Sequence, residues 1–508
     1  MTTSTEPETT AVEPSETPAR KDRALAPVRA LTQRFGAATV AFAMVATVFG
    51  AVFAVLTPAF WGHDEITQFG RAYQVAHGGV FPQRIVDDRG VAYGGQIPVS
   101  VDELMGYAFI DYNDNPEEPD AMVADPAAYD RLGAAEISAT TRQMWFTNTA
   151  AYSPVPYVPA AVGIRLGEAL GLNVGGLYLL ARFAGLVAYL AVVGFGLYAL
   201  RERRSQWLVF TVAVLPIALF QAGTVTADTL TNALAIMVSA LLLKALFVGD
   251  RLHRAETAAL LAATIALPLS KPTYVLLAML VVVVPADRLG FAGKLKFLPW
   301  AFAVTGGVLF LAWTKIAAPT GDGMGLMRPP HQWGQVRPGD QLKGILSDPV
   351  QFVHTFGESI ALRDHRWFNQ FFGELGFAYV DAPAISMLAC LLAFAVSFGI
   401  VDRMSTATAT FRRTLIVALT VLASVAMIYV TLYMSFTPVD FYIIDGVQGR
   451  YFVPLAIMAL AVLARVVPLR LSNADGVIPA RGTAITVACS STFALIATAA
   501  TYYTVVWG

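Results

Sequence analysis

Charged side chains are scarce in this chain: they make up 14% of its 508 residues, against about 25% in an average soluble domain. The 35 Lys and Arg residues nearly cancel the 36 Asp and Glu residues, which leaves a formal net charge of −1. This balance excludes a basic nucleic-acid-binding protein and an acidic tail protein. The only two cysteines, Cys390 and Cys489, lie in apolar runs, so neither a disulfide framework nor a Cys-based metal site is expected.

Long apolar runs are abundant instead, since 56% of the residues are hydrophobic. A transmembrane helix needs roughly 20 apolar residues, and the stretch 36–56 has this length without a single charge. Ten further runs lie at roughly 177–199, 207–222, 225–247, 256–270, 273–287, 297–317, 382–401, 413–434, 450–468 and 482–505. We therefore predict an all-α polytopic membrane protein with about 11 transmembrane helices.

Basic residues gather in alternate turns, and the positive-inside rule places those turns in the cytoplasm. They are Arg201, Arg203, Arg204, Arg251, Arg254, Arg288, Lys294, Lys296, Arg403, Arg412, Arg413, Arg465 and Arg470. Arg20, Lys21, Arg23, Arg29 and Arg34 precede the first span and predict a cytoplasmic N-terminus; the polar region before that span is too long for a cleaved signal peptide. With 11 spans the C-terminus lies outside. Integration in a bacterial plasma membrane is the expected location.

The segment 152–171 is apolar enough to be mistaken for a span. Counting it as one would invert every later basic cluster, and its prolines Pro154, Pro156 and Pro159 suit an entry turn better. We predict a helix lying on the outer interface. The chain then divides into a disordered cytoplasmic tail (1–35), a transmembrane module (36–317) with an outer loop (58–176), a second outer loop (318–381) and C-terminal transmembrane helices (382–508).

Adjacent carboxylates, Asp64 and Glu65, follow the first span directly. An amphipathic stretch begins there, so one of them could simply cap a helix. Capping needs only one carboxylate, however, and does not explain His63 and Arg71 alongside.

Four more ionisable residues lie at outer turns: Asp228, Lys271, Glu374 and Arg450. Each has a simpler interpretation, such as a helix cap for Asp228, a snorkelling lysine for Lys271 or a lipid-headgroup contact for Arg450. Yet all of them fall on one face of the membrane, where independent structural charges would be divided between both faces. A carboxylate can take a proton from a hydroxyl and cations can hold a leaving phosphate, so the set suits a reaction on a phosphate-bearing lipid.

Several stretches in fixed order carry a family resemblance: His63–Glu65 with Arg71–Tyr73, Tyr152–Pro154 through Pro159, Phe220–Gln221 with Thr226–Asp228, Ser270–Thr273, Gly373–Gly376 with Asp381, and Gln448–Phe452. The order resembles a family of bacterial polytopic membrane proteins that carried a domain-of-unknown-function label, and that family is similar to the GT-C glycosyltransferases. The resemblance implies a GT-C-like bundle with two large outer loops that carry interfacial helices.

The resemblance also implies an inverting transfer of a sugar from a polyprenyl-phosphate donor to a cell-envelope glycan or lipid acceptor at the outer face. It implies Asp64 as the catalytic base and Glu65 as its catalytic neighbour. We assign donor and lipid-phosphate binding to Lys271 and Arg450 by inference, because a Tyr-Ser-Pro sequence stands where related enzymes have a basic residue. The remaining predicted binding residues are Asp228, Arg71, Tyr73, Gln448, Tyr152 and Glu374. A divalent ion, Mg²⁺ or Mn²⁺, on Glu65 or Asp228 is a further option.

Two alternatives use the same outer charges. A transporter or flippase of a lipid-linked sugar would need polar residues near the bilayer midplane, and the spans are nearly free of them; Arg182 is the main exception. A non-catalytic scaffold of cell-wall assembly would tolerate replacement of the acidic pair. Membrane lipids are expected partners whether the protein is a transferase, a transporter or a scaffold, and no nucleic-acid partner is expected.

Overall fold

The computed structural model describes residues 27, 29–87, 90–113, 121–377, 379–402, 408–467, 471 and 480–508. Most of the predicted disordered tail (1–35) therefore lies outside the described residues, but its described residues 29–35 are helical. Several charged residues used above also lie outside them: Arg20, Lys21, Arg23, Arg403 and Arg470.

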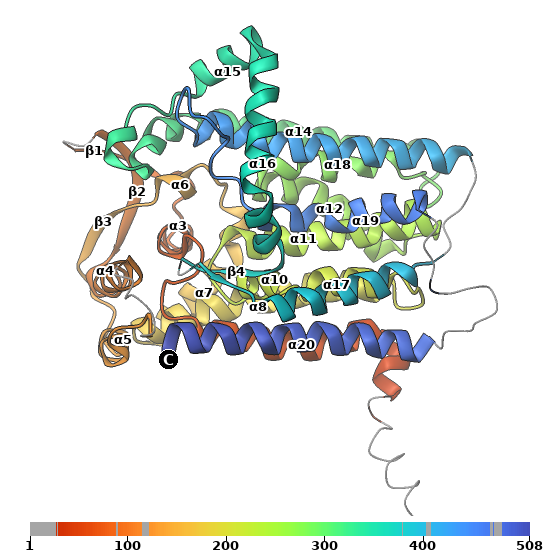
Figure 1. Cartoon of the computed structure of the whole chain (residues 1–508), viewed down its shortest axis with the longest axis horizontal. Coiled ribbons are helices and arrows are strands. Elements are labelled where there is room, and N and C mark those ends of the chain that lie inside the picture. The colour runs from red at the N-terminus through yellow and green to blue at the C-terminus, as the bar shows by residue number, and fades with distance from the viewer. Residues whose placement is uncertain are drawn as a thin grey trace, which may run out of the picture.

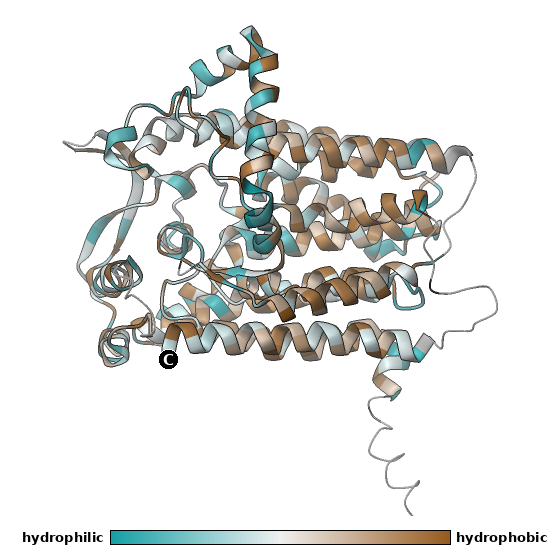
Figure 2. Cartoon of the chain, viewed as in Figure 1, coloured by the Kyte–Doolittle hydropathy of each residue, from teal (hydrophilic) through white to brown (hydrophobic). Residues whose placement is uncertain are grey.

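Roughly parallel helices form a bundle whose long axis is horizontal in Figure 1, and most of their residues are hydrophobic (Figure 2). Within the described residues, seven helices are long and apolar enough to cross a membrane. They are α2 (Ala37–Leu56), α8 (Val174–Ala199), α11 (Ala227–Leu242) continued by the π-helix η2 (Leu243–Val248), α14 (Leu298–Ala317), α18 (Thr408–Ser435), η8 (Gly449–Phe452) with α19 (Val453–Val466), and α20 (Ala480–Trp507). The chain is thus a helical polytopic membrane protein.

The other four predicted spans are also helical but shorter. They correspond to α9 (Gln206–Ala213) with α10 (Pro216–Ala222), α12 (Arg254–Ser270), η3 (Pro272–Tyr274) with α13 (Val275–Met279) and η4 (Leu280–Val283), and α17 (Ala384–Gly399). Proline limits several of them, because it lacks the N–H that continues a helix. The 17 residues of α12 span about 26 Å, slightly less than the roughly 30 Å hydrocarbon core. Length and composition support seven spans, and the larger number of about 11 remains a prediction.

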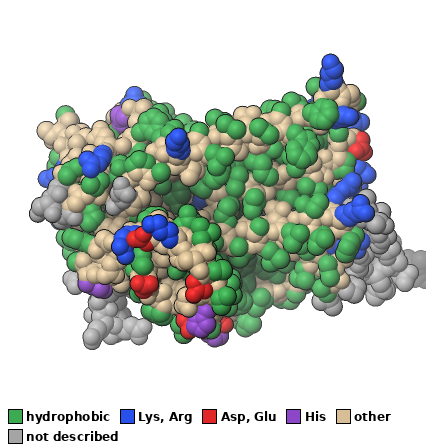
Figure 3. All heavy atoms as spheres, turned by 90° about the horizontal axis from the view of Figure 1, so that it is seen from above, with side chains coloured by type: hydrophobic (Ala, Val, Ile, Leu, Met, Phe, Trp, Pro, Cys, Tyr) green, Lys and Arg blue, Asp and Glu red, His purple; other side chains and the backbone are tan. Residues whose placement is uncertain are grey.

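The predicted inner turns meet at one end of the bundle. Arg203 pairs with Asp250 at 2.6 Å, and the Ser205 hydroxyl donates to Asp402 at 2.6 Å. Figure 3 shows Lys and Arg gathered at one end of an otherwise hydrophobic flank. The start of α2 lies here, since the amide of Ala38 donates to Gln206, whereas the last residues of α20 contact the first outer loop. The start of α2 and the end of α20 therefore lie at opposite ends of the bundle.

The opposite end, which we call the outer end, carries a layer that includes β-structure, so the prediction of an all-α chain is wrong in this detail. A three-stranded antiparallel sheet has the order β1 (Gln83–Asp87), β2 (Gly90–Pro98), β3 (Thr141–Trp145). Glycine permits the closest strand approach, because a Cβ on Gly94 would lie 1.9 Å from the Met144 carbonyl oxygen. Helices complete the layer: α3 (Glu65–Ala76), α4 (Val99–Asn113), α5 (Pro126–Gly133), α6 (Thr147–Ala150), η1 (Val155–Tyr157) and α7 (Val158–Ala169).

The ambiguous segment 152–171 forms η1 and the 12-residue helix α7, about 18 Å long and too short to cross a bilayer. One face of α7 is apolar and exposed, through Val158, Val162 and Leu166. Spacing of four residues puts these side chains on one stripe. The segment is therefore not one of the long apolar spans, in agreement with the prediction.

The second outer loop contains a lateral arm. It runs through η6 (Ala318–Met327), η7 (Pro330–Gln332), α15 (Pro338–Ser347) and α16 (Pro349–Gly373), then a hairpin of β4 (Glu374–Leu375) and β5 (Val380–Asp381). In Figure 1, α16 crosses the long axis of the bundle and α15 projects beyond it. The hairpin returns to the first loop, since the amide of Phe377 donates to the carbonyl of Trp61 at 3.0 Å.

Candidate active site at the outer end of the bundle

A tight turn after α2 carries the predicted acidic pair. Asp64 adopts the left-handed backbone conformation, with φ 53°, which costs free energy for a residue with a Cβ. It stands at the N-cap of α3, yet its side chain makes no capping hydrogen bond. The interpretation of Asp64 as a mere helix cap is therefore excluded. Strained backbone of this kind often marks functional sites.

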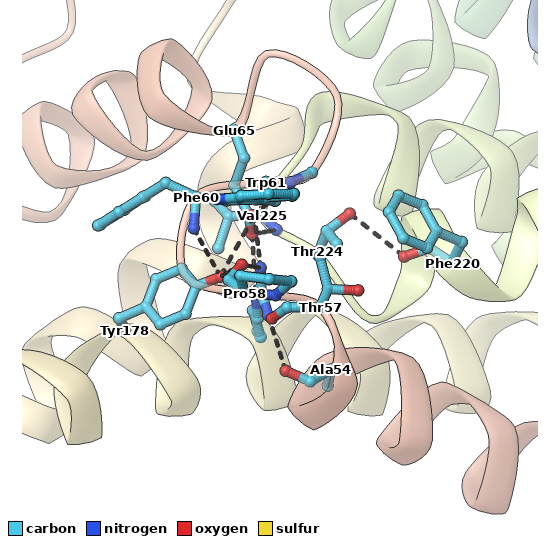
Figure 4. Close-up of polar contacts among 12 residues, drawn as sticks. Ala54, Thr57, Pro58, Phe60, Trp61, Glu65, Tyr178, Phe220, Thr224 and Val225 are labelled. Atoms are coloured by element: carbon cyan, nitrogen blue, oxygen red, sulfur yellow. Dashed lines mark hydrogen bonds and ion pairs between the residues drawn. The ribbon is translucent and has the colours of Figure 1, made fainter. Parts of the chain in front are cut away.

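Glu65 faces the protein interior. It is fully buried, and Arg182 donates to its two oxygens from Nε at 2.8 Å and Nη2 at 2.6 Å. The amides of Val225 and Gly62 donate at 2.7 and 2.9 Å and the Tyr178 hydroxyl at 3.3 Å, so Glu65 lies at the centre of the contacts in Figure 4. Because donors already surround both oxygens, we correct its predicted catalytic and metal-binding roles to a structural role.

Arg182 shares this role. Its remaining nitrogens donate to the carbonyls of Ala54, Thr57 and Pro58 at 2.7, 2.7 and 3.0 Å. The pair therefore ties the end of α2 to α8 and to the turn before α11. Arg182, the main exception to the lack of charge in the predicted spans, is thus fully paired.

Four predicted residues converge beside this turn although they lie far apart in the sequence. Lys271 Nζ contacts Asp228 Oδ1 at 2.6 Å. Arg450 lies between the two acids, with Nη2 3.7 Å from Asp64 Oδ2 and Nε 3.6 Å from Asp228 Oδ2. We call Asp64, Asp228, Lys271 and Arg450 the charge cluster. It contains two anions and two cations, so its formal charge is zero.

Asp228 is firmly held and is not a helix cap either. The Thr226 side chain caps α11 by accepting from the amide of Asp228. The Asp228 carboxylate accepts from Lys271 and, at 2.8 Å, from Gln221 Nε2. Gln221 in turn accepts from Asn232, which fixes its orientation. Asp228 therefore positions Lys271 and is not free to accept a proton from a substrate.

Arg450, in contrast, has unused hydrogen-bonding capacity. It is 5% exposed, its distances to both acids exceed those of ordinary hydrogen bonds, and its Nε has no hydrogen-bond partner. A buried donor without a partner costs about 1–3 kcal/mol. A planar guanidinium with unpaired N–H groups is suited to bind an oxyanion with two parallel hydrogen bonds.

Asp64 is the accessible member of the cluster, since 36% of its side chain remains exposed. Loss of solvent raises its pKa above the ordinary value, against the opposing effect of Arg450. A carboxylate with a raised pKa is a stronger base. Burial opposes the charge of Lys271, but Asp228 and the nearby tyrosines more than offset this effect and hold its pKa well above the ordinary value. Lys271 is therefore a permanent cation.

The turn that carries Arg450 packs tightly on α16. A Cβ on Gly449 would lie 1.9 Å from the Trp367 carbonyl oxygen, so only glycine fits there. The amide of Gly449 donates to Gln370 at 2.8 Å, and Gln370 donates to Glu374 at 2.7 Å. Glu374, predicted to bind substrate, thus acts one step away from the cluster by orienting this turn.

Two other predicted binding residues, Arg71 and Tyr73, make their contacts outside the charge cluster. Arg71 is buried and donates to the carbonyls of Gly79, Val80 and Tyr152, so it holds loops together. Tyr73 is 8% exposed, and its ring lies against that of His77 with centroids 4.3 Å apart. We therefore correct its predicted substrate-binding role to one in packing.

Tyr152 and Gln448 remain close to the charge cluster. Burial raises the pKa of Tyr152 to about 12, although Lys271 lowers it, so its hydroxyl stays protonated and can donate. Gln448 Oε1 is buried without a hydrogen-bond partner, and this residue precedes the Gly449–Arg450 turn.

Asn148 also lies at the site, although its sequence context does not predict this. Its amide donates to Asp64 Oδ1 at 3.2 Å, while its own Oδ1 is buried without a partner. His63 Nδ1 is also unpaired, and burial together with Arg450 holds the pKa of His63 well below its ordinary value. Asn148 lies in a polar stretch without a recognisable pattern, so only the fold could identify it.

The donor set does not fit a divalent ion. Both oxygens of Glu65 already accept hydrogen bonds from protein donors. Asp228 is bound by Lys271 and Gln221, and the Arg450 side chain lies between Asp64 and Asp228. In the described parts of the chain, no group of three or more His, Cys, Asp and Glu residues could hold a metal ion. We therefore derive no step through Mg²⁺ or Mn²⁺.

Fold and site together define a helical polytopic membrane protein with a buried charge cluster at one end of its bundle. The chain belongs to the family described as predicted membrane protein (DUF2142), whose profile matches residues 47–459. That region contains the whole charge cluster. No curated protein and no solved structure matches the chain.

Proposed function

We propose that this protein is an inverting glycosyltransferase. It transfers a sugar from a polyprenyl-phosphate carrier to a hydroxyl of a cell-envelope glycan or lipid at the outer face of the membrane. The proposal rests on one observation: an accessible carboxylate of raised pKa, Asp64, lies beside the underused cation Arg450 and the paired cation Lys271. The resemblance to GT-C enzymes supports the same reaction class.

In this reaction Asp64 acts as the general base. The acceptor oxygen attacks the anomeric carbon from the face opposite the phosphate and passes its proton to Asp64. The bond between the anomeric carbon and the phosphate oxygen breaks, and its electron pair stays on the polyprenyl phosphate. The phosphate gains one negative charge in this step.

The charge cluster matches this change in charge. Protonation of Asp64 removes a negative charge beside Arg450, so the cluster changes from neutral to a net charge of +1 as the phosphate becomes a dianion. Fixed charges that favour the developing charge lower the barrier without reorganisation. Lys271 supplies its ammonium from a position set by Asp228 and by the ring of Tyr451, 4.1 Å away.

The test is a transfer assay with purified protein in nanodiscs, without an ion gradient. Radiolabelled polyprenyl-phosphate pentoses and hexoses serve as donors, and envelope oligosaccharides serve as acceptors. We expect Asp64→Asn to lower turnover by about 10²–10⁴-fold, the usual loss for a general base, and Glu103→Gln, at an exposed acid of the same loop, to retain it. Full activity of Asp64→Asn would contradict the base assignment. Donor movement without product would indicate a flippase.

A further inference from the structure

A cavity of about 110 Å³ lies between the first outer loop and the outer end of α14. Its walls include Phe81, Tyr93, Ala150, Trp313, Ile316 and Ala317. The rings of Phe81 and Trp313 are stacked, with centroids 5.6 Å apart and an interplanar angle of 11°. Phe81 is 53% and Ile316 50% exposed, so the cavity reaches the surface of the molecule.

The lining favours a hydrocarbon ligand. An apolar cavity of about 150 Å³ stays dry and takes up an apolar molecule such as benzene, so this volume suits a small apolar group of a few carbon atoms. The cavity lies where α14 ends, and α14 exposes Val304, Val308 and Leu311 along its length. A helix with such a surface borders lipid. The cavity thus lies next to the exposed apolar surface of α14.

One short segment connects the cavity with the charge cluster. Asn148 donates to Asp64, Ala150 lines the cavity, and the carbonyl of Ala151 accepts from Trp313 Nε1 at 2.8 Å. The next residue, Tyr152, lies in the field of Lys271. Residues 148–152 therefore connect Asp64, the cavity and the surroundings of Lys271.

We propose that this cavity binds the first part of the hydrocarbon chain of the lipid whose phosphate lies at Lys271 and Arg450. The site thereby distinguishes branched polyprenyl chains from the straight chains of bulk phospholipids. This inference deepens the proposed function and depends on it for the identity of the phosphate lipid. The stacked rings of Phe81 and Trp313 form part of the cavity wall.

Photo-crosslinking tests the proposal without turnover. A polyprenyl phosphate with a diazirine in the isoprene units nearest the phosphate is irradiated with the full-length protein in nanodiscs, and the labelled peptides are identified by mass spectrometry. We expect labelling of the segments around Phe81 and around residues 313–320. Ala317→Leu should reduce it about tenfold, at the low end of the effect of blocking a hydrophobic pocket, while Ala301→Leu, the same change at an exposed position of α14, should not.

A second variant and a second probe make the result decisive. Phe81→Ala should also reduce labelling, which covers the case in which Ala317→Leu does not fold. A phosphatidylglycerol with a diazirine near its headgroup should label the cavity weakly. Equal labelling by both probes, or labelling that neither variant changes, would overturn the inference. Asp64→Asn should retain labelling, because it removes the base and not the cavity. Wild-type protein that is labelled by the polyprenyl probe but never transfers sugar would contradict the proposed function alone.

Discussion

At the scale of single residues, two adjacent carboxylates have opposite environments. Glu65 is fully buried and receives donors on both oxygens, whereas Asp64 is partly exposed and has only a 3.2 Å hydrogen bond to Asn148 and a 3.7 Å contact to Arg450. Environment, and not residue type, divides structural from chemical roles in such pairs. The adjacent positions in the sequence contain no sign of this difference.

The Glu65–Arg182 pair predicts a strong effect on stability. Glu65→Gln leaves the Arg182 charge buried without its counter-ion, and breaking a buried pair in this way costs about 3–5 kcal/mol. Thermal unfolding in detergent, followed by tryptophan fluorescence, should show a clearly lower Tm. The double variant Glu65→Gln/Arg182→Met should lose less than the sum of the single changes. Additive losses would show that the two residues do not act as a unit.

The raised pKa of Asp64 predicts the acid limb of the activity profile. The base must be ionised, so log(kcat/KM) should be constant above this pKa and fall with decreasing pH below it. Because burial raises the pKa, the fall should begin at a higher pH than the ordinary value of about 3.9 for Asp. A profile that is flat down to that value would contradict the role of Asp64, provided that Tm stays constant over the range.

At the scale of elements, the site is assembled from turns that the fold brings together. The turn after α2 supplies Asp64, the N-terminus of α11 supplies Asp228, and the turns before η3 and in η8 supply Lys271 and Arg450. The apolar runs predict that all four turns lie on one face. That they meet at 2.6–3.7 Å depends on the packing of the helices, which periodicity does not contain.

The contact between η8 and α16 predicts a position-specific loss of activity. In Gly449→Ala the new Cβ would lie 1.9 Å from the carbonyl oxygen of Trp367, so the turn must move and Arg450 moves with it. We expect turnover to fall by about 10–100-fold, or 1.4–2.7 kcal/mol. Gly194→Ala, at a helix position with open space around it, should keep its activity. Equal activity of the two variants would contradict the role of this contact.

The sequence predicted the helical membrane class, the alternate turns and four cluster residues from charge and hydropathy. It did not predict the β-sheet of the first outer loop, because the close approach at Gly94 depends on a partner strand about 50 residues later. It also assigned chemistry to Arg71 and Tyr73, which lie on α3 beside the acids but point into loop and helix contacts. Burial, which separates such cases, follows only from tertiary packing.

At the scale of the whole molecule, the two ends of the bundle carry different chemistry. Ion pairs such as Arg203–Asp250 join the turns at one end, and the charge cluster with the sheet layer occupies the other. The positive-inside rule predicts that the first end faces the cytoplasm.

Cysteine labelling checks this orientation. In a background without Cys390 and Cys489, Glu103→Cys in the outer layer should react with a membrane-impermeant maleimide in intact cells. Glu202→Cys, whose native side chain is 82% exposed at the other end, should react only after permeabilisation. The reverse pattern would invert the topology and place the charge cluster in the cytoplasm.

The central claim is that Lys271 and Arg450 hold a lipid phosphate beside Asp64. An experimental structure of the full-length protein in nanodiscs with bound polyprenyl phosphate tests it most directly. We expect phosphate oxygens within hydrogen-bond distance of Arg450 or Lys271, on the side of the cluster that Asp64 faces. A phosphate bound elsewhere, with the two cations still occupied only by Asp64 and Asp228, would contradict it.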